Sequence, residues 1–189
     1  PSRPRARPVI VIDPGHGGID GGAQGAHGAE KDVVLSVARQ VRHALLATRR
    51  YEVVMTRSSD VFVSLDNRVR MSRRANADLF VSIHADSLAQ KDLAQSVRGA
   101  TVYTLAEKAS DDRSRALAEK ENAADLLAGI NVASAGDDGQ VRDILFDLMR
   151  RETANFASDF RGLLVQSLRP RMRLAKDPMR SGPFKVLRQ

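Results

Sequence analysis

The chain has 189 residues, of which 42% are hydrophobic and 28% charged, and it contains no cysteine. This length and apolar content are typical of one globular domain whose core needs no disulfide. No stretch approaches the roughly 20 apolar residues of a membrane-spanning helix, so we expect no membrane span. The net charge of +7 favours an anionic partner, but aromatic residues make up only 4% of the chain. Because single-stranded nucleic acids are bound largely by aromatic stacking, we expect no nucleic-acid partner and interpret the basic residues as a solvated surface with a weak attraction for acidic polymers.

The chain opens with PSRPRARP at positions 1–8, which we interpret as the remnant of a linker whose targeting region lay further upstream. The stretch 9–22, VIVIDPGHGGIDGG, then joins four β-branched residues to a glycine-rich loop that carries His16. Strands that are apolar on both faces belong to sheets covered on both sides, and ligands gather at the carboxyl ends of such strands. We therefore expect chemistry at His16, although a glycine-rich turn with a surface histidine would show the same residues.

Two more residues extend the pattern around His16. Glu30 begins a helix-like segment, EKDVVLSVARQVRHALL, and His84 ends a second apolar strand, LFVSIH. Two histidines and a glutamate form a common ligand set for catalytic zinc, which leaves a fourth position to water. Each of the three lies at a strand end or a helix start, so one edge of a sheet would bring them together. Taken alone, Glu30 is equally explained as a first-turn acid that stabilises its helix.

The remaining pattern predicts alternating strands and helices. Strands are expected at 51–56, 79–84 and 99–105, and helices after Glu30, after a capping Ser64 and from Val141 onward, with SGPFKVL beginning a last strand. Such alternation implies parallel βαβ units and hence an α/β fold: a single domain with a mostly parallel twisted sheet flanked by helices. The apolar residues expected to face the sheet are Val34, Val37, Val41 and Leu45 in the first helix, and Leu145, Leu148, Phe156, Phe160, Leu163 and Leu164 in the last.

Acids near the two histidines are candidates to orient them. A carboxylate that accepts the free ring N–H of a ligand histidine fixes its tautomer and increases its basicity. Asp13, Asp20 and Asp86 are close in sequence, and we favour Asp13 and Asp86. Arg68, on the helix after Ser64, is expected to have a structural role and to pair with a carboxylate.

The motifs DPGHGG, GAEKDVVL and SIHAD resemble those of the zinc-dependent N-acetylmuramoyl-L-alanine amidases of the bacterial cell wall, the amidase_3 family, and in particular its periplasmic cell-division members. This resemblance covers nearly all of the chain from Val9 to Leu187. It implies one Zn²⁺ held by His16, Glu30 and His84. It also implies a periplasmic enzyme whose substrate is peptidoglycan, cleaved between N-acetylmuramic acid and the L-alanine of the stem peptide during septal wall splitting.

Residues 106–140 do not fit a short connection within an α/β sheet. A strong helix is predicted over 113–130, and the loop NVASAGDDGQ follows it. The resemblance implies a regulatory insertion whose helix covers the zinc site and supplies an acid to the metal until an activator with a LytM-type domain removes it. Glu121 is the first candidate for that acid, followed by Asp125 and Glu119, while a solvated helix face explains each of these acids about as well.

The family's general base is a glutamate in a segment resembling PSVLVE, which would follow Gln189, so no catalytic base is expected within the present residues. Two other functions share the observed pattern. A different zinc peptidase of the cell wall, such as a carboxypeptidase, would use the same ligands. A non-catalytic wall-binding module would use the glycine-rich loop to cradle an anion at a helix N-terminus, although no GKS or GKT follows the glycines as it would in a P-loop.

Overall fold

The computed structural model describes residues 7–25, 28–85, 99–127, 129 and 143–188. Contacts between its Cα atoms divide the chain into two compact units. The first unit contains residues 1–87, 122–130 and 186–189, and the second contains 88–121 and 131–185. The linker predicted at 1–8 lies mostly outside the described residues.

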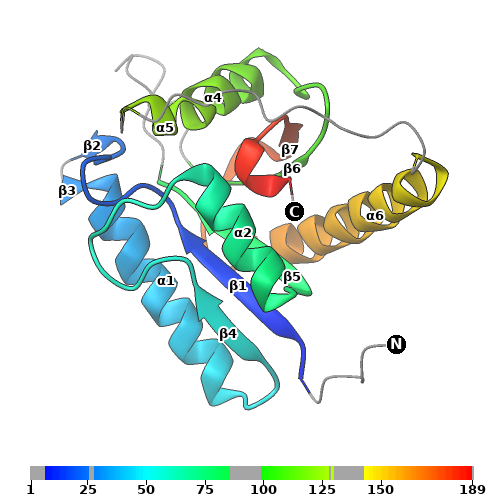
Figure 1. Ribbon diagram of the computed structural model, residues 1–189, viewed down its shortest axis with the longest axis horizontal. Coiled ribbons are helices and arrows are strands. Elements are labelled where there is room, and N and C mark those ends of the chain that lie inside the picture. The colour runs from blue at the N-terminus through cyan, green and yellow to red at the C-terminus, as the bar shows by residue number, and fades with distance from the viewer. Residues whose placement is uncertain (1–6, 26–27, 86–98, 128, 130–142, 189) are drawn as a thin grey trace. The chain divides into compact units, whose positions relative to one another are not determined.

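The first unit is built on a three-stranded parallel sheet with β1 (Val9–Pro14) at its centre (Figure 1). The strands β4 (Glu52–Met55) and β5 (Leu79–Ile83) lie on either side of β1, and Val11 stands opposite Val54 on one and Phe80 on the other. All six residues of β1 are buried, as the run of β-branched residues predicts for a strand covered on both faces.

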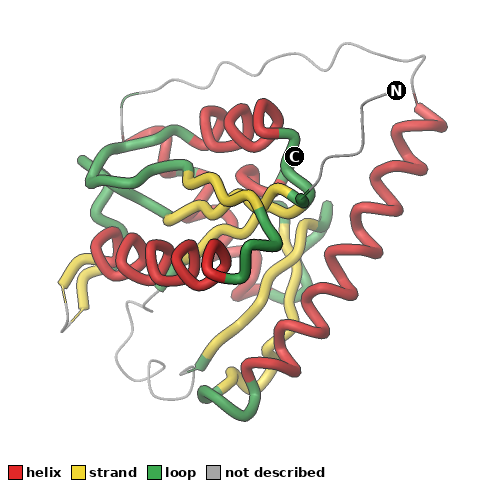
Figure 2. Tube along the Cα trace, turned by 90° about the horizontal axis from the view of Figure 1, so that it is seen from below, coloured by secondary structure: helices red, strands yellow, loops and turns green. Residues whose placement is uncertain are grey.

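Two helices cover this sheet. The helices α1 (Glu30–Ala47) and α2 (Leu65–Ala75) both contact β1, and Figure 2 shows them on opposite faces. The predicted cap is confirmed, since the hydroxyl of Ser64 accepts a hydrogen bond from the backbone N–H of Asn67 at 3.4 Å. A short hairpin of β2 (Gln24–Gly25) and β3 (Gly28–Ala29) precedes α1.

The buried face of α1 differs from the prediction. Val34, Leu35 and Ala38 are buried, whereas Val37 and Val41 are 41% and 38% exposed. Glu30 is also buried and lies one turn before Val34 and two turns before Ala38, so the buried residues of α1 begin at this acid. Leu45, as predicted, packs against the core formed by Ile10, Ile12 and Ala38.

The second unit contains a parallel pair of strands, β6 (Ala100–Leu105) and β7 (Leu174–Gly182), which both contact the long helix α6 (Asp143–Leu168). The prediction that a strand begins at SGPFKVL is wrong: β7 starts earlier, and Lys185–Leu187 forms the 3₁₀ turn η1. The sequence pattern did not predict the early part of β7, because the charged residues and Pro178 between Leu174 and Met179 interrupt its apolar residues. The pairing of β7 with β6 also shifts in register between these two residues.

Two helix predictions need correction in detail. The helix expected over 113–130 is broken by a turn at Ala123 into α4 (Asp112–Asn122) and α5 (Ala124–Leu127). In α6, Val165 is buried, while Phe156 and Leu163 are 56% and 63% exposed rather than packed on the strands. The side chains of Leu145 and Leu148 and the whole loop at 131–140 lie outside the described residues.

The α/β class with parallel strands flanked by helices is confirmed. None of the helices in the described part of the chain combines the length and the apolar content that crossing a membrane requires.

Candidate metal centre

His16 is held at the carboxyl end of β1 by an unusual backbone conformation. Its φ angle is +59°, in the left-handed region that residues with a side chain rarely adopt, and Gly17 and Gly18 after it also have positive φ. The backbone N–H of Gly15 donates to the carbonyl of Ile83 at 3.0 Å, which fastens the loop to the end of β5. Left-handed residues held by their surroundings concentrate at functional sites.

The structure brings together His16, Glu30 and His84 from three separate elements of the first unit. Nε2 of His16 lies 3.2 Å from Oε1 of Glu30, and Nδ1 of His84 lies 3.3 Å from the same oxygen. The centroids of the two imidazole rings are 4.9 Å apart, with the ring planes inclined by 76°. The convergence that the sequence predicts at this edge of the sheet is therefore present in the geometry.

Glu30 is fixed as an anion at the centre of this group. It is 2% exposed, and its carboxylate accepts hydrogen bonds from the backbone N–H of Ala23 at 3.0 Å and of Ala85 at 2.7 Å. Burial by itself raises the pKa of this carboxyl, but the interactions with the rings of His16 and His84 and the hydrogen bonds from the two backbone groups outweigh it and leave the pKa well below its usual value. The carboxylate is thus ionised and ready to accept a cation.

The acid that orients His16 is Asp20. Its Oδ2 lies 2.8 Å from Nδ1 of His16, so the ring presents Nε2 to Glu30. Burial raises the pKa of Asp20, but the hydrogen bond and charge of His16 lower it more, and the net shift is downward. Our preference for Asp13 was wrong, and Asp86 lies outside the described residues.

Asp13 belongs to a different buried network. Its carboxylate accepts hydrogen bonds from Thr56 and Arg68 at 2.5 Å each and from Ser82 at 2.7 Å. Burial raises the pKa of Asp13, whereas the charge of Arg68 and these hydrogen bonds lower it further than burial raises it. The prediction that Arg68 pairs with a carboxylate is confirmed, and the strand's alternation points Asp13 towards α2 instead of towards the histidines.

Two glycines make room for the cluster. A Cβ atom on Gly15 would collide with the ring of His84, and one on Gly22 would lie 2.6 Å from Cδ2 of His16 and 2.9 Å from Oε2 of Glu30. Gly22 also has a φ of +65°. At these two positions the absence of a Cβ lets the cluster's own side chains approach the backbone.

The donor atoms fit a zinc ion. Zinc bonds to nitrogen and oxygen of about 2.0–2.1 Å in a tetrahedron separate the ligand atoms by about 3.3–3.4 Å. The observed separations of 3.2 and 3.3 Å between Glu30 and the two histidines are close to that edge length. A neutral histidine oriented by a carboxylate is also the usual arrangement at such sites.

The three acids proposed for the insertion lie in different settings. Asp125 is buried in the first unit, where its carboxylate accepts a hydrogen bond from the backbone N–H of Leu65 at 2.9 Å, so it stabilises the start of α2. Glu119 is exposed, and Oε1 of Glu121 lies 3.2 Å from Nζ of Lys120. Contact of any of these acids with a metal stays a prediction.

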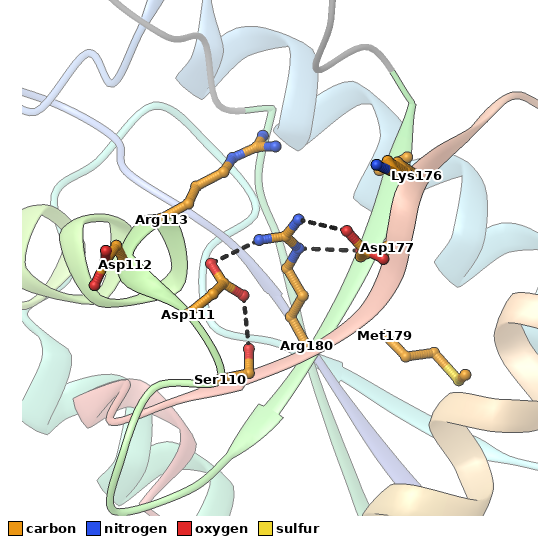
Figure 3. Close-up of a pocket in the computed structure, with 9 residues that line it drawn as sticks. Ser110, Asp111, Asp112, Arg113, Lys176, Asp177, Met179 and Arg180 are labelled. Atoms are coloured by element: carbon orange, nitrogen blue, oxygen red, sulfur yellow. Dashed lines mark hydrogen bonds and ion pairs between the residues drawn. The ribbon is translucent and has the colours of Figure 1, made fainter.

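A cavity of about 800 Å³ in the second unit contains none of the predicted site residues (Figure 3). Arg180 lies in it, with its guanidinium 2.7 Å from the carboxylate of Asp111 and 3.0 Å from the carbonyl of Asp177. This network joins the start of α4 to β7, and we assign it a structural role.

The fold and the cluster together define an α/β protein with two histidines at the carboxyl ends of its parallel strands and a glutamate at the start of a helix. The sequence profile of a family described as N-acetylmuramoyl-L-alanine amidase (Amidase_3) matches residues 10–189, and the chain belongs to this family. The match includes both compact units.

Individual proteins are similar to this chain. The chain is 36% identical to the N-acetylmuramoyl-L-alanine amidase AmiA of Escherichia coli over 99% of its own length and 65% of that protein. It is 38% identical to AmiC of Neisseria meningitidis over 96% of its own length and 42% of that protein. Among solved structures, AmiC2 of Nostoc punctiforme is 44% identical over 52% of this chain and 53% of that chain, with a TM-score of 0.47. The chain thus spans less than two thirds of the length of these curated relatives.

Proposed function

We propose that this chain carries the metal site of a zinc-dependent amidase that hydrolyses the bond between N-acetylmuramic acid and L-alanine in peptidoglycan. The observation that supports the proposal most directly is the approach of His16 Nε2 and His84 Nδ1 to one oxygen of Glu30, at 3.2 and 3.3 Å. Membership of the amidase family supports the choice of substrate.

Each residue of the proposed zinc site has its own role. His16, Glu30 and His84 would hold the ion, with Asp20 keeping the proton of His16 on Nδ1 so that Nε2 is available as a ligand. Bound zinc would supply Lewis acidity to the scissile carbonyl and to a water molecule. A carboxylate must still accept a proton from water and return it to the leaving amine, and the family resemblance assigns this role to a glutamate beyond Gln189.

Metal analysis tests the site. The purified chain should bind one equivalent of zinc, and His84→Ala should remain folded while its zinc content collapses. A full equivalent of zinc in His84→Ala would refute the ligand assignment. His43, which is exposed on α1, offers a matched control, because His43→Ala should keep its zinc.

Product analysis tests the substrate. Hydrolysis is assayed with the parent protein, which supplies whatever follows Gln189, on purified muropeptides. An amidase releases stem peptides with a free L-alanine amino group, whereas a carboxypeptidase shortens the peptide from its other end and leaves the link to muramic acid intact. Release of a carboxyl-terminal residue alone would replace the amidase by the peptidase alternative.

We further propose that the enzyme acts in the periplasm on septal peptidoglycan and is restrained by the α4–α5 segment until an activator with a LytM-type domain binds. Glu121 is the candidate for the restraining acid, since Asp125 already bonds to Leu65 and Glu119 is exposed. In the parent protein, Glu121→Ala should raise the basal amidase activity without an activator, and Glu119→Ala should not. Unchanged activity in Glu121→Ala, with zinc still bound, would exclude Glu121 as the restraining acid.

A further inference from the structure

Two arginines, Arg57 and Arg68, are buried next to the His16 loop, and each is only 3% exposed. Arg57 lies two residues after the end of β4, and Arg68 lies in the first turn of α2. A buried cation is costly unless its N–H groups are all bonded. The groups that these two arginines contact therefore indicate which segments of the site each guanidinium holds in place.

Arg57 joins two segments of the candidate site. Its Nε donates to the carbonyl of Pro14 at 3.0 Å, and its Nη2 donates to the carbonyl of Gly15 at 2.7 Å. The same Nη2 donates to the carbonyl of Lys31 at 2.8 Å. One planar guanidinium thus connects the two residues before His16 with the residue after Glu30.

Arg68 completes the contacts on the loop side. It donates to the carbonyls of Pro14 and His16 at 2.8 Å each, and it pairs with Asp13. The carbonyls of three successive residues, 14 to 16, therefore point at buried guanidinium groups. These bonds satisfy main-chain carbonyl groups that would cost free energy if they were buried without a donor. They do so in the segment where His16 adopts its left-handed conformation, which is itself unfavourable.

The two arginines bond to different segments of the chain. Arg68 donates to the loop, to Asp13 and to the carbonyl of Val63, and within the described part of the chain none of these hydrogen bonds reaches the start of α1. Arg57, in contrast, donates both to the His16 loop and to the first turn of α1. Lysine cannot replace it, because a single ammonium group lacks the forked donors that reach three carbonyls in different directions.

We propose that Arg57 is a positioning residue that fixes the separation between His16 and Glu30 before any metal arrives. The inference rests on the zinc site proposed above, to which it adds a residue that touches neither metal nor substrate. Partners that orient metal ligands typically contribute roughly 10- to 100-fold to metal affinity. We expect a loss of that size when Arg57 is changed.

The test measures zinc affinity of the 189-residue chain by competition with a chromophoric chelator, at a temperature where every variant is folded. Arg57→Lys should bind zinc roughly 10- to 100-fold more weakly than the wild type. Arg57→Gln, which carries no charge to bury and keeps two N–H donors, is a second variant with the same expected direction. Arg39 on α1 donates to the carbonyl of Ser58 at 2.6 Å from an exposed position, so Arg39→Lys is the matched control and should keep the wild-type affinity.

A second measurement needs no metal. The backbone N–H of Ala23 donates to Oε2 of Glu30 at 3.0 Å, so hydrogen exchange of this amide in the apoprotein reports whether Glu30 stays in place. Arg57→Lys should speed exchange at Ala23 relative to amides of β4, because Glu30 loses its link to the His16 loop. Arg39→Lys should not change it.

The outcomes separate the two proposals. If the wild type binds no zinc, the proposed function fails, and exchange at Ala23 alone decides the role of Arg57. If both Arg57 variants lose stability but keep the wild-type zinc affinity and Ala23 exchange, Arg57 is merely structural and the inference is overturned. Failure of both variants to fold would also overturn it, because Arg57 would then be required by the fold as a whole.

Discussion

The carboxylate of Asp20 lies 2.8 Å from Nδ1 of His16, inside a turn that returns the chain to the histidine only four residues later. The turn is closed by the paired backbone groups of Gly17 and Asp20. His16 therefore has its tautomer set by a residue of its own loop, and loss of that residue should weaken the site without disturbing the sheet.

Asp20→Ala is accordingly expected to lower zinc affinity roughly 10- to 100-fold. Isothermal titration with zinc measures the loss directly. Asp66→Ala is the control, because Asp66 is exposed on α2 and should leave the affinity unchanged. Equal affinity in the wild type and Asp20→Ala would mean that the backbone alone orients His16.

Gly15→Ala should displace the ring of His84, since the added methyl group would occupy its space. We expect reduced zinc content, together with a loss of stability of about 1–3 kcal/mol from overpacking. Gly162→Ala on α6 is the matched comparison, because nothing lies within 4 Å of its added Cβ, and it should raise stability by about 0.5–1 kcal/mol. Zinc content and urea unfolding are measured for both variants. Full zinc occupancy in Gly15→Ala would contradict the packing argument.

Removing either partner of the Asp13–Arg68 ion pair should be strongly destabilising, because each leaves an uncompensated buried charge. Asp13→Asn and Arg68→Met are each expected to cost about 3–5 kcal/mol in the free energy of unfolding. The double variant should cost less than the sum of the two, since the charges are then removed together. Strict additivity in urea unfolding would show that the two residues do not interact.

Asp111 should make stability depend on pH in the acid range. Burial raises its pKa, but hydrogen bonds from Ser114 and Ser110 and the charge of Arg180 bring it down to about 2, below the ordinary 3.8. A depressed pKa means that the stabilisation is complete above about pH 4 and is lost as the pH falls towards about 2. Asp111→Asn should therefore lose less stability than the wild type between pH 4 and pH 2.

Urea unfolding at several pH values measures this difference. Asp112→Asn, at a neighbouring side chain that is 91% exposed, corrects for the general effect of removing one acid. Parallel stability curves for the wild type and Asp111→Asn would refute the prediction.

Asp125→Ala should destabilise the protein by about 1 kcal/mol, because the backbone N–H of Leu65 loses its buried acceptor. Glu119→Ala should change stability by less than about 0.5 kcal/mol, since Glu119 is exposed. Thermal unfolding distinguishes the two. A stable Asp125→Ala with raised amidase activity in the parent protein would instead favour Asp125 as the restraining acid.

The sequence was sufficient to predict the elements and the convergence at the sheet edge because strand ends and helix starts are local features. His16, Glu30 and His84 each follow or begin a strongly patterned segment, and parallel strands bring such positions together. The direction of individual side chains was harder to predict. Asp13 is nearer to His16 in sequence than Asp20 is, yet the pleat of β1 turns it towards Arg68, while the turn at residues 17–20 turns Asp20 back to the ring.

Arg57 was missed for a related reason. An arginine directly after a strand looks like the start of a solvated loop, and its partners are main-chain carbonyls, which leave no mark on the sequence. The break in the predicted helix at Ala123 was hidden for another reason, because alanine is a strong helix former and the interruption has no glycine or proline.

The two histidines face Glu30 through different nitrogens, Nε2 in His16 and Nδ1 in His84. In a metal-bound protein their remaining protons would sit on opposite nitrogens, so a long-range ¹⁵N–¹H NMR spectrum would contain one ring of each pattern. The NMR signals of the two histidine rings could then be told apart without substituting either residue. The site can therefore be followed one ligand at a time as metal is added.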